Sequence, residues 1–326
     1  LMKKEESEKK YLICNVDEGD PGAYMNRNEM ESDPHMLLEG MLIAAYVTGA
    51  DEGIIYVRAE YPLAVERLSR AIQDAYANNL LGDDILGANM RFNLQVVEGA
   101  GAFVCGEETA LIASLEGRAG RPRSKPPFPS QKGYLGYPTT INNLETWCNI
   151  PLIIGKGSDW FMRYGIPSSP GTKVFSLVGK VKHTGLVELP LGEKLTTLVY
   201  EAGGGSVSKT KRIKAVQSGG PSGGCIPSHL FDKSIDYESL AALGSIMGSG
   251  GMVVMDNDNC MVDSARYFVE FTTKESCGNC TPCREGLSQV LSILDRITKG
   301  EGRKEDLVML ETLGAHISDT AMCGLG

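Results

Sequence analysis

Three cysteine residues stand within seven positions near the end of the chain, in the stretch ESCGNCTPCREG at residues 275–286. The spacing of Cys277, Cys280 and Cys283 is too tight for separate disulfides. Zinc sites usually pair two thiolates and take two further ligands some distance along the chain. Three thiolates at this spacing with a remote fourth are typical of a cubane iron–sulfur cluster, which takes four cysteine thiolates. With Cys323 as the remote candidate, the spacing favours a 4Fe-4S cluster over zinc or a redox dithiol.

The remaining cysteines show no such spacing. Cys14, Cys105, Cys148, Cys225 and Cys260 stand apart in mostly apolar stretches, which favours buried core thiols over metal ligands. The four histidines are far apart in the chain, and no Walker loop, nucleophile elbow or His-Glu-x-x-His sequence occurs. The sequence therefore gives no support to hydrolytic chemistry.

A basic, proline-rich segment lies between residues 117 and 144. It contains no acidic residue and five basic ones, namely Arg118, Arg121, Arg123, Lys125 and Lys132. A cationic, aromatic-bearing loop of this kind could hold a dinucleotide, with Lys125 at a phosphate and Phe128 against a ring. The alternative is a solvated loop or a surface that docks a partner protein.

Acidic residues precede this segment at two places. Glu107 and Glu108 stand at a predicted helix start after a glycine-rich turn, where they either complement the helix dipole or accept hydrogen bonds from sugar hydroxyls. Asp17, Glu18 and Asp20 either cap turns or bind ribityl and ribose hydroxyls. A glycine-rich turn is by itself a weak signal, so both interpretations remain open here.

Length and composition limit the class of protein. The chain has 326 residues, enough for roughly two or three domains with sizeable cores. Its net charge of −9 argues against a general nucleic-acid binder or a protein of anionic membrane surfaces. No apolar stretch reaches the length of about 18 residues that would indicate a membrane span. Nine unevenly spaced cysteines fit a reducing, cytoplasmic setting better than a secreted disulfide scaffold.

Periodicity places these residues on an alternating pattern of strands and helices. Strands are predicted at residues 11–16, 54–58 and 91–97, and residues 15–32 are read as polar and turn-rich. Helices are predicted from Asp33 to Gly49, at 62–79 and at 107–116, which together indicate an α/β domain with a partly parallel sheet. Residues 172–258 are read as a β-rich domain with a buried strand near its end. Helical periodicity returns after residue 260, at 265–272, 283–298 and 304–318.

Four stretches of the chain resemble the NADH-binding flavoprotein subunit shared by respiratory complex I, NAD-linked hydrogenases and NAD-linked formate dehydrogenases. They are NVDEGDPGAYMNR, GAGAFVCGEETALIASLEGRAGRPRSKPPFP, TTINNLET, and ESCGNCTPCREG with the closing CGLG. The resemblance covers almost the whole chain in the same order. It implies a Rossmann-like α/β domain for FMN and NADH at residues 1–163, a β-grasp (ubiquitin-like) domain at 164–259, and a helical bundle carrying the 4Fe-4S cluster at 260–326.

The resemblance also assigns individual residues. It implies an FMN pocket lined by Asn15, Asp17, Glu18, Gly106, Glu107, Asn142 and Asn143. It places on the NAD(H) side Asp20, Phe103, Glu108, Lys125, Phe128 and Pro129. The cluster ligands are Cys277, Cys280, Cys283 and Cys323. No catalytic side chain is implied, because FMN itself carries the hydride.

Several departures from the family pattern refine this expectation. Phe103 stands where a tyrosine is usual, and Asp20 replaces the glutamate typical of complex I. The motif EGDPGAYMNR is more similar to that of the hydrogenase and formate dehydrogenase branch than to that of complex I. The glycine-rich flavin loop of the family would precede the first motif, so we expect this chain to be a fragment.

The function implied by the resemblance is an NADH (or NAD+) oxidoreductase subunit. It would pass a hydride between NAD(H) and FMN, and single electrons between FMN and the cluster, within a soluble hydrogenase or formate dehydrogenase complex. The expected partners are a small thioredoxin-like 2Fe-2S subunit, a larger iron–sulfur subunit and, where a relative bifurcates electrons, ferredoxin. The alternatives are the NADH-oxidising subunit of complex I and a non-enzymatic electron relay or docking module.

Overall fold

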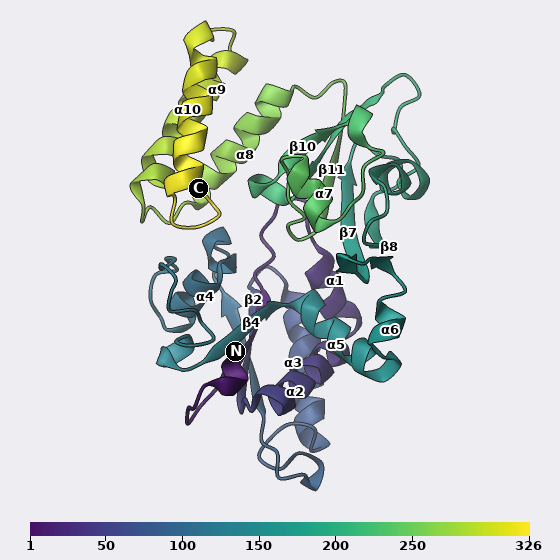
Figure 1. The fold of residues 1–326 in the computed structure, drawn as a ribbon, viewed down its shortest axis with the longest axis vertical. Helices are drawn as coiled ribbons and strands as arrows, with labels where there is room; N and C mark the ends of the chain where they lie inside the picture. Colours follow the sequence, from purple (N-terminus) through teal and green to yellow (C-terminus); the bar gives the residue numbers. More distant parts are fainter. The chain divides into compact units, whose positions relative to one another are not determined.

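The computed structural model describes residues 1–326, and the chain divides into two compact units (Figure 1). The first unit comprises Leu1–Gly19 and Tyr24–Phe161. The second comprises Asp20–Ala23 and Met162–Gly326. A short segment near the start of the chain, Asp20–Ala23, therefore belongs to a unit otherwise built from the second half of the sequence.

The first unit is built on a four-stranded parallel sheet in the order β3-β2-β1-β4. The strands are β1 (Tyr11–Val16), β2 (Glu52–Arg58), β3 (Asn93–Gly99) and β4 (Thr139–Asn143). Consecutive residues of β1 and β2 are buried, as expected for parallel strands covered on both faces. The predicted strands are confirmed, whereas β4 had no sequence signal of its own apart from its place in the motif TTINNLET.

Helices α2 (Pro34–Thr48), α3 (Pro62–Ala77) and α5 (Leu144–Lys156) contribute to the core of this unit. The predicted start of α2 is confirmed, because the Asp33 side chain accepts a hydrogen bond from the Met36 N–H at 3.2 Å. Gly49 ends the helix in a left-handed conformation with φ 74°. Helices α4 (Glu108–Leu115) and α6 (Ser158–Phe161) are shorter.

Helix α1 (Met25–Ser32) corrects the interpretation of residues 15–32 as a turn-rich stretch. The local sequence offers no capping side chain at Tyr24. Instead, the Glu18 carboxylate accepts hydrogen bonds from the backbone N–H groups of Asn26, at 3.1 Å, and Arg27, at 3.2 Å. A cap supplied from several residues upstream lies outside the local pattern that predicts helix starts.

The second unit contains a five-stranded mixed sheet in the order β10-β9-β11-β7-β8. Only β7 and β11 pair in parallel, and the other neighbours are antiparallel. Strand β11 (Gly251–Asp256) confirms the buried strand that was predicted near the end of residues 172–258. The elements of this region are β5 (Gly165–Ile166), β6 (Ser169–Pro170), β7 (Thr172–Gly179), β8 (Gly185–Pro190), β9 (Ile213–Ser218), β10 (Gly224–Pro227), α7 (Tyr237–Ala242) and β11 (Gly251–Asp256).

Three helices follow the sheet, as the returning periodicity predicts: α8 (Met261–Glu275), α9 (Leu287–Thr298) and α10 (Lys304–Thr320). Helix α9 packs against both α8 and α10 (Figure 1). Ion pairs between Arg266 and Asp295 and between Arg296 and Asp306 join the same neighbours. None of the helices is long and apolar enough to cross a membrane.

Candidate functional site

The residues assigned to FMN lie around the carboxyl ends of β1 and β4. The chain runs from β1 to β2 and β3 on one side, and β4 returns to the other side of β1. The boundary between β1 and β4 is therefore the topological switch point of the sheet, where open parallel sheets bind ligands outside the carboxyl ends of their strands. Asn15 and Asn143 pair across this boundary, as do Cys14 and Asn142.

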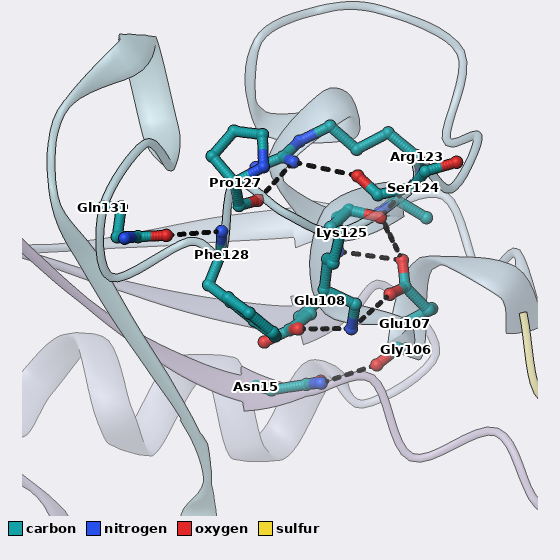
Figure 2. A network of polar contacts seen from close by, with 12 residues as sticks. Asn15, Gly106, Glu107, Glu108, Arg123, Ser124, Lys125, Pro127, Phe128 and Gln131 are labelled. Atoms are coloured by element: carbon teal, nitrogen blue, oxygen red, sulfur yellow. Dashed lines mark hydrogen bonds and ion pairs between the residues drawn. The ribbon is translucent and has the colours of Figure 1, made fainter. Parts of the chain in front are cut away.

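Hydrogen bonds join Asn15, Gly106 and Asn143 at this point. The Asn15 Nδ2 donates to the Gly106 carbonyl at 2.8 Å (Figure 2), and the Asn143 Nδ2 donates to the Asn15 carbonyl at 3.4 Å. The Asn143 amide also donates to the Asn26 Oδ1 at 2.7 Å and caps α5 by accepting from the Glu145 N–H. Strand alternation places the Asn142 side chain on the opposite face, with Cys14.

The two acids that follow β1 are held within the first unit. The Asp17 carboxylate, 1% exposed, forms an ion pair with Arg58 at 3.0 Å, and Arg58 also donates to the Gly101 carbonyl at 2.7 Å. Glu18 is buried and caps α1 through the two backbone N–H groups described above. Both acids therefore have a structural task, and their negative charges lie beside the carboxyl end of β1.

Glu107, Glu108 and Lys125 form a compact charged group at the start of α4 (Figure 2). Glu107 caps the helix, accepting from the N–H groups of Thr109 at 2.8 Å and Ala110 at 3.0 Å. The Lys125 ammonium lies 2.6 Å from Glu108 and 3.6 Å from Glu107. The hydrogen bond to Glu108 raises the pKa of Lys125, so the ammonium remains protonated at neutral pH.

Arg123 organises the loop that carries Lys125. Its guanidinium donates to the carbonyls of Pro127, at 2.6 Å, and Lys132, at 2.7 Å. The buried Pro129 ties the loop to β4, because its carbonyl accepts from the Thr139 N–H at 2.8 Å. This structural role of Arg123 was missed in the sequence, where it counted only as one charge in a basic segment.

The ordered loop presents Phe128, 52% exposed, on the same side as Lys125 (Figure 2). Arg118, Arg121 and Lys132 instead line a cavity of about 400 Å³ whose lining does not include Lys125. Phe103 lies in the turn η3 (Phe103–Gly106) before α4. The basic residues of this segment therefore do not form one patch. Lys125 pairs with Glu107 and Glu108, whereas Arg118, Arg121 and Lys132 line the cavity.

Asp20 belongs to the second unit, whereas the other residues assigned to NAD(H) belong to the first. Its carboxylate accepts a hydrogen bond from the Ser249 hydroxyl at 3.0 Å. Burial raises the pKa of Asp20, and the Ser249 hydroxyl opposes that rise.

The proposed cluster ligands come together at one end of the three C-terminal helices. Cys277, Cys280 and Cys283 lie between α8 and α9, and Cys323 follows the end of α10. Burial raises the pKa of the Cys283 thiol, and the thiols of Cys280, Cys323 and Cys277 raise it further. All nine cysteines are free thiols. No three His, Cys, Asp or Glu side chains are arranged to hold a single metal ion.

The loop between α8 and α9 is shaped around these thiols. Gly278 adopts φ 69°, its N–H donates to the Ser276 Oγ at 3.2 Å, and its carbonyl accepts from Arg284 at 2.7 Å. The Ser276 Oγ lies 3.2 Å from the Cys283 Sγ. A Cβ on Gly326 would lie 3.4 Å from the same sulfur, so the segment after Cys323 closes against Cys283. Four thiols brought together by two separate segments fit a four-thiolate cluster.

The prediction that the other five cysteines are buried is wrong for two of them. Cys14 and Cys105 are buried and Cys148 is partly buried, but Cys225 and Cys260 are exposed. Cys225 lies on the edge strand β10, and Cys260 precedes α8. Apolar neighbours in sequence do not bury a side chain at a sheet edge or a helix start.

Two families match separate parts of the chain. Residues 1–152 match the family described as Nuo51 FMN-binding domain. Residues 263–326 match the family described as NADH-ubiquinone oxidoreductase-F iron-sulfur binding region. These ranges contain the residues at the β1–β4 switch point and the four clustered thiols, respectively.

Individual proteins are similar over nearly the whole chain. The NADP-reducing hydrogenase subunit HndC of Solidesulfovibrio fructosivorans is 54% identical over 98% of this chain and 65% of its own length. A subunit of the NADH-quinone oxidoreductase of Rhizobium meliloti is 47% identical over 97% of this chain and 75% of its own length. A crystal structure of an NAD+-reducing [NiFe]-hydrogenase in the H2-reduced state superposes with a TM-score of 0.90, at 35% identity, over 99% of this chain and 54% of that one. The chain thus spans about half to three quarters of the length of these proteins.

Proposed function

The chain belongs to the family of FMN-binding and iron–sulfur-binding flavoprotein subunits that includes HndC and the similar subunits of NADH-quinone oxidoreductases, and on that premise we propose that it oxidises NAD(P)H, or reduces NAD(P)+, within a multi-subunit hydrogenase-type complex. The observation that carries this proposal is the position of the FMN-assigned residues at the topological switch point of a parallel sheet. The same chain gathers four thiols suited to a 4Fe-4S cluster.

Bound FMN would supply the chemistry, because a flavin accepts a hydride and releases its electrons singly. The chain's own residues would orient the flavin and set the electrostatics around it. We propose that the FMN pocket is formed by Asn15, Asp17, Glu18, Gly106, Glu107, Asn142 and Asn143. The Asn15 and Asn143 amides are already fixed by hydrogen bonds, which suits groups that must hold a ligand in one orientation.

We propose that the nicotinamide dinucleotide is bound by Asp20, Phe103, Glu108, Lys125, Phe128 and Pro129. Lys125 would bind phosphate by a charge-assisted hydrogen bond, and the exposed ring of Phe128 offers a stacking surface. Glu108 would accept from sugar hydroxyls once Lys125 turns to phosphate. Cys277, Cys280, Cys283 and Cys323 would hold the cluster that exchanges electrons with FMN.

The domain organisation supports the same proposal. Residues 1–163 would form the Rossmann-like domain, because the sheet order β3-β2-β1-β4 is that of a doubly wound half. Residues 164–259 would form a β-grasp domain, in which the first long strand β7 and the last strand β11 pair in parallel between antiparallel neighbours. Residues 260–326 would form the helical cluster-binding domain.

We propose a cytoplasmic hydrogenase complex with a small 2Fe-2S subunit and a larger iron–sulfur subunit as partners. The higher identity to HndC than to the NADH-quinone oxidoreductase subunits favours this assembly over complex I. The test is anaerobic purification of the native complex, followed by identification of its subunits and assay of NADH and NADPH oxidation with an artificial electron acceptor. Flavin-dependent turnover with co-purifying hydrogenase subunits would support the proposal. A complex without FMN, or without turnover of either nucleotide, would overturn it.

Replacing Glu18 with glutamine tests the flavin-side assignment. The amide retains one acceptor oxygen but turns an N–H donor toward a backbone N–H of α1, so we expect a loss of about 1–2 kcal/mol in the free energy of unfolding. Removal of the negative charge should also raise the flavin reduction potential, because that charge disfavours the anionic reduced flavin. Thermal unfolding and redox titration of the complex measure the two effects.

The matched control is Glu31→Gln, which alters an acid on α1 that forms an ion pair with Arg27 one helical turn away. We expect it to change stability by less than about 0.5 kcal/mol and to leave the flavin potential unchanged. Lower stability with an unchanged flavin potential in Glu18→Gln would mean that Glu18 only caps α1.

A further inference from the structure

The segment Asp20–Ala23 is bound to the mixed sheet of the second unit. The Ser176 hydroxyl, on β7, donates to the Gly22 carbonyl at 2.5 Å. The Ala23 N–H donates to the Asp20 carbonyl at 3.0 Å, which closes a turn at Asp20. Asp20 is therefore positioned by this sheet, although it is only two residues from Glu18, which is anchored in the first unit.

Two residues of the second unit lie against the Asp20 carboxylate. Ser249, just before β11, donates its hydroxyl to Oδ2 at 3.0 Å. Gly220, just after β9, lies so close that an added Cβ would be 2.4 Å from the carboxylate carbon. Gly220 also adopts φ 62°, a conformation that side chains disfavour. The hydroxyl fixes one oxygen, and the absent side chain leaves the space in which the carboxylate sits.

We propose that Ser249 and Gly220 are positioning residues that hold the Asp20 carboxylate in one orientation for a ribose hydroxyl of the nicotinamide dinucleotide. This role rests on the proposed function and extends it to two residues of the second unit. A carboxylate that binds a sugar hydroxyl must accept with a defined oxygen, and a side chain fixed in advance loses less conformational entropy on binding. Ser249 supplies that restraint on the oxygen beside it.

The test compares Ser249→Ala, Ser249→Thr and Asp20→Asn in the native complex. Loss of one hydrogen bond to the carboxylate should raise the KM for the preferred nucleotide about three- to tenfold in Ser249→Ala, with kcat little changed. Threonine, which retains the hydroxyl, should restore the KM. In the Asp20→Asn background, Ser249→Ala should have little further effect, because both changes act on the same contact.

A pH profile distinguishes positioning from a general structural role. Binding weakens as the pH falls through the pKa of Asp20, because the protonated acid is a poorer acceptor. The Ser249 hydroxyl lowers that pKa against the effect of burial, so its loss should move the acid limb of the KM profile to higher pH. Ser208→Ala, whose hydroxyl pairs with Thr210 in an exposed loop, is the serine control and should change neither KM nor its pH profile.

Gly220→Ala provides a second measurement. We expect it to raise the KM more than Ser249→Ala does, because the added methyl group would displace the Asp20 carboxylate. If the wild-type complex oxidises the nucleotide and Ser249→Ala has an unchanged KM, this role is overturned and the proposed function remains intact. Full additivity of Ser249→Ala with Asp20→Asn would also overturn it. A wild-type complex that oxidises neither NADH nor NADPH would instead overturn the proposed function itself.

Discussion

Replacing Cys283 with serine should remove the iron–sulfur cluster from the protein. Cys283 is the most buried of the four proposed ligands, and it packs with Leu287 and Ile317. A serine hydroxyl at this position binds iron far more weakly than a thiolate does. We expect iron and acid-labile sulfide to fall from about four of each per chain to a small fraction of that, with loss of the reducible cluster spectrum.

Cys260→Ser is the matched control, because Cys260 is an exposed thiol at the start of α8 and outside the proposed cluster loop. It should leave the iron and sulfide contents unchanged. Cys323→Ser should reproduce the loss seen with Cys283→Ser, since both segments contribute ligands. Stoichiometric zinc without sulfide in anaerobically prepared wild-type protein would contradict the cluster assignment.

The central strands of the first unit could be predicted because their signal is local. Residues 11–16 form a mostly apolar strand, and the start of α2 has both a capping aspartate and a proline. Helix α1 could not be predicted, because its cap is Glu18, a residue separated from the helix by a turn. The burial of Cys225 and Cys260 was predicted wrongly for a related reason, since it depends on the place of a sheet edge or a helix start in the fold and not on apolar neighbours in the sequence.

In the candidate site, too, the features that depend on local motifs could be predicted from the sequence, whereas those that depend on tertiary contacts could not. The spacing of Cys277, Cys280 and Cys283 indicates a cluster by itself, because three adjacent thiolates have few other uses. The alternative roles of Asp17 and Glu18 could not be separated from the sequence. The structure shows that both acids have structural partners, Arg58 for Asp17 and the α1 backbone for Glu18. A structural partner and a ligand contact do not exclude each other for a carboxylate, which has two oxygens.

Replacing Lys125 with alanine should raise the KM for the nicotinamide dinucleotide roughly ten- to hundredfold while leaving the FMN content unchanged. A charge-assisted contact to phosphate contributes about 1.5–3 kcal/mol. The structure adds a second cause, because the Lys125 ammonium lies 2.6 Å from Glu108 and 3.6 Å from Glu107. Without it, two carboxylates would face the dinucleotide phosphates. Steady-state kinetics of the native complex measure the change.

The pH dependence of this effect follows from the pKa of Lys125, which the hydrogen bond to Glu108 raises. A raised pKa keeps the ammonium charged until the pH exceeds the ordinary lysine value of about 10.4. The KM ratio between variant and wild type should therefore be constant from about pH 6 to pH 9. Lys132→Ala is the matched control, because it removes one charge from the same loop at a cavity that does not include Lys125. Equal effects of the two variants would indicate general attraction by a basic loop, and an unchanged KM in Lys125→Ala would indicate a solvated loop without a dinucleotide contact.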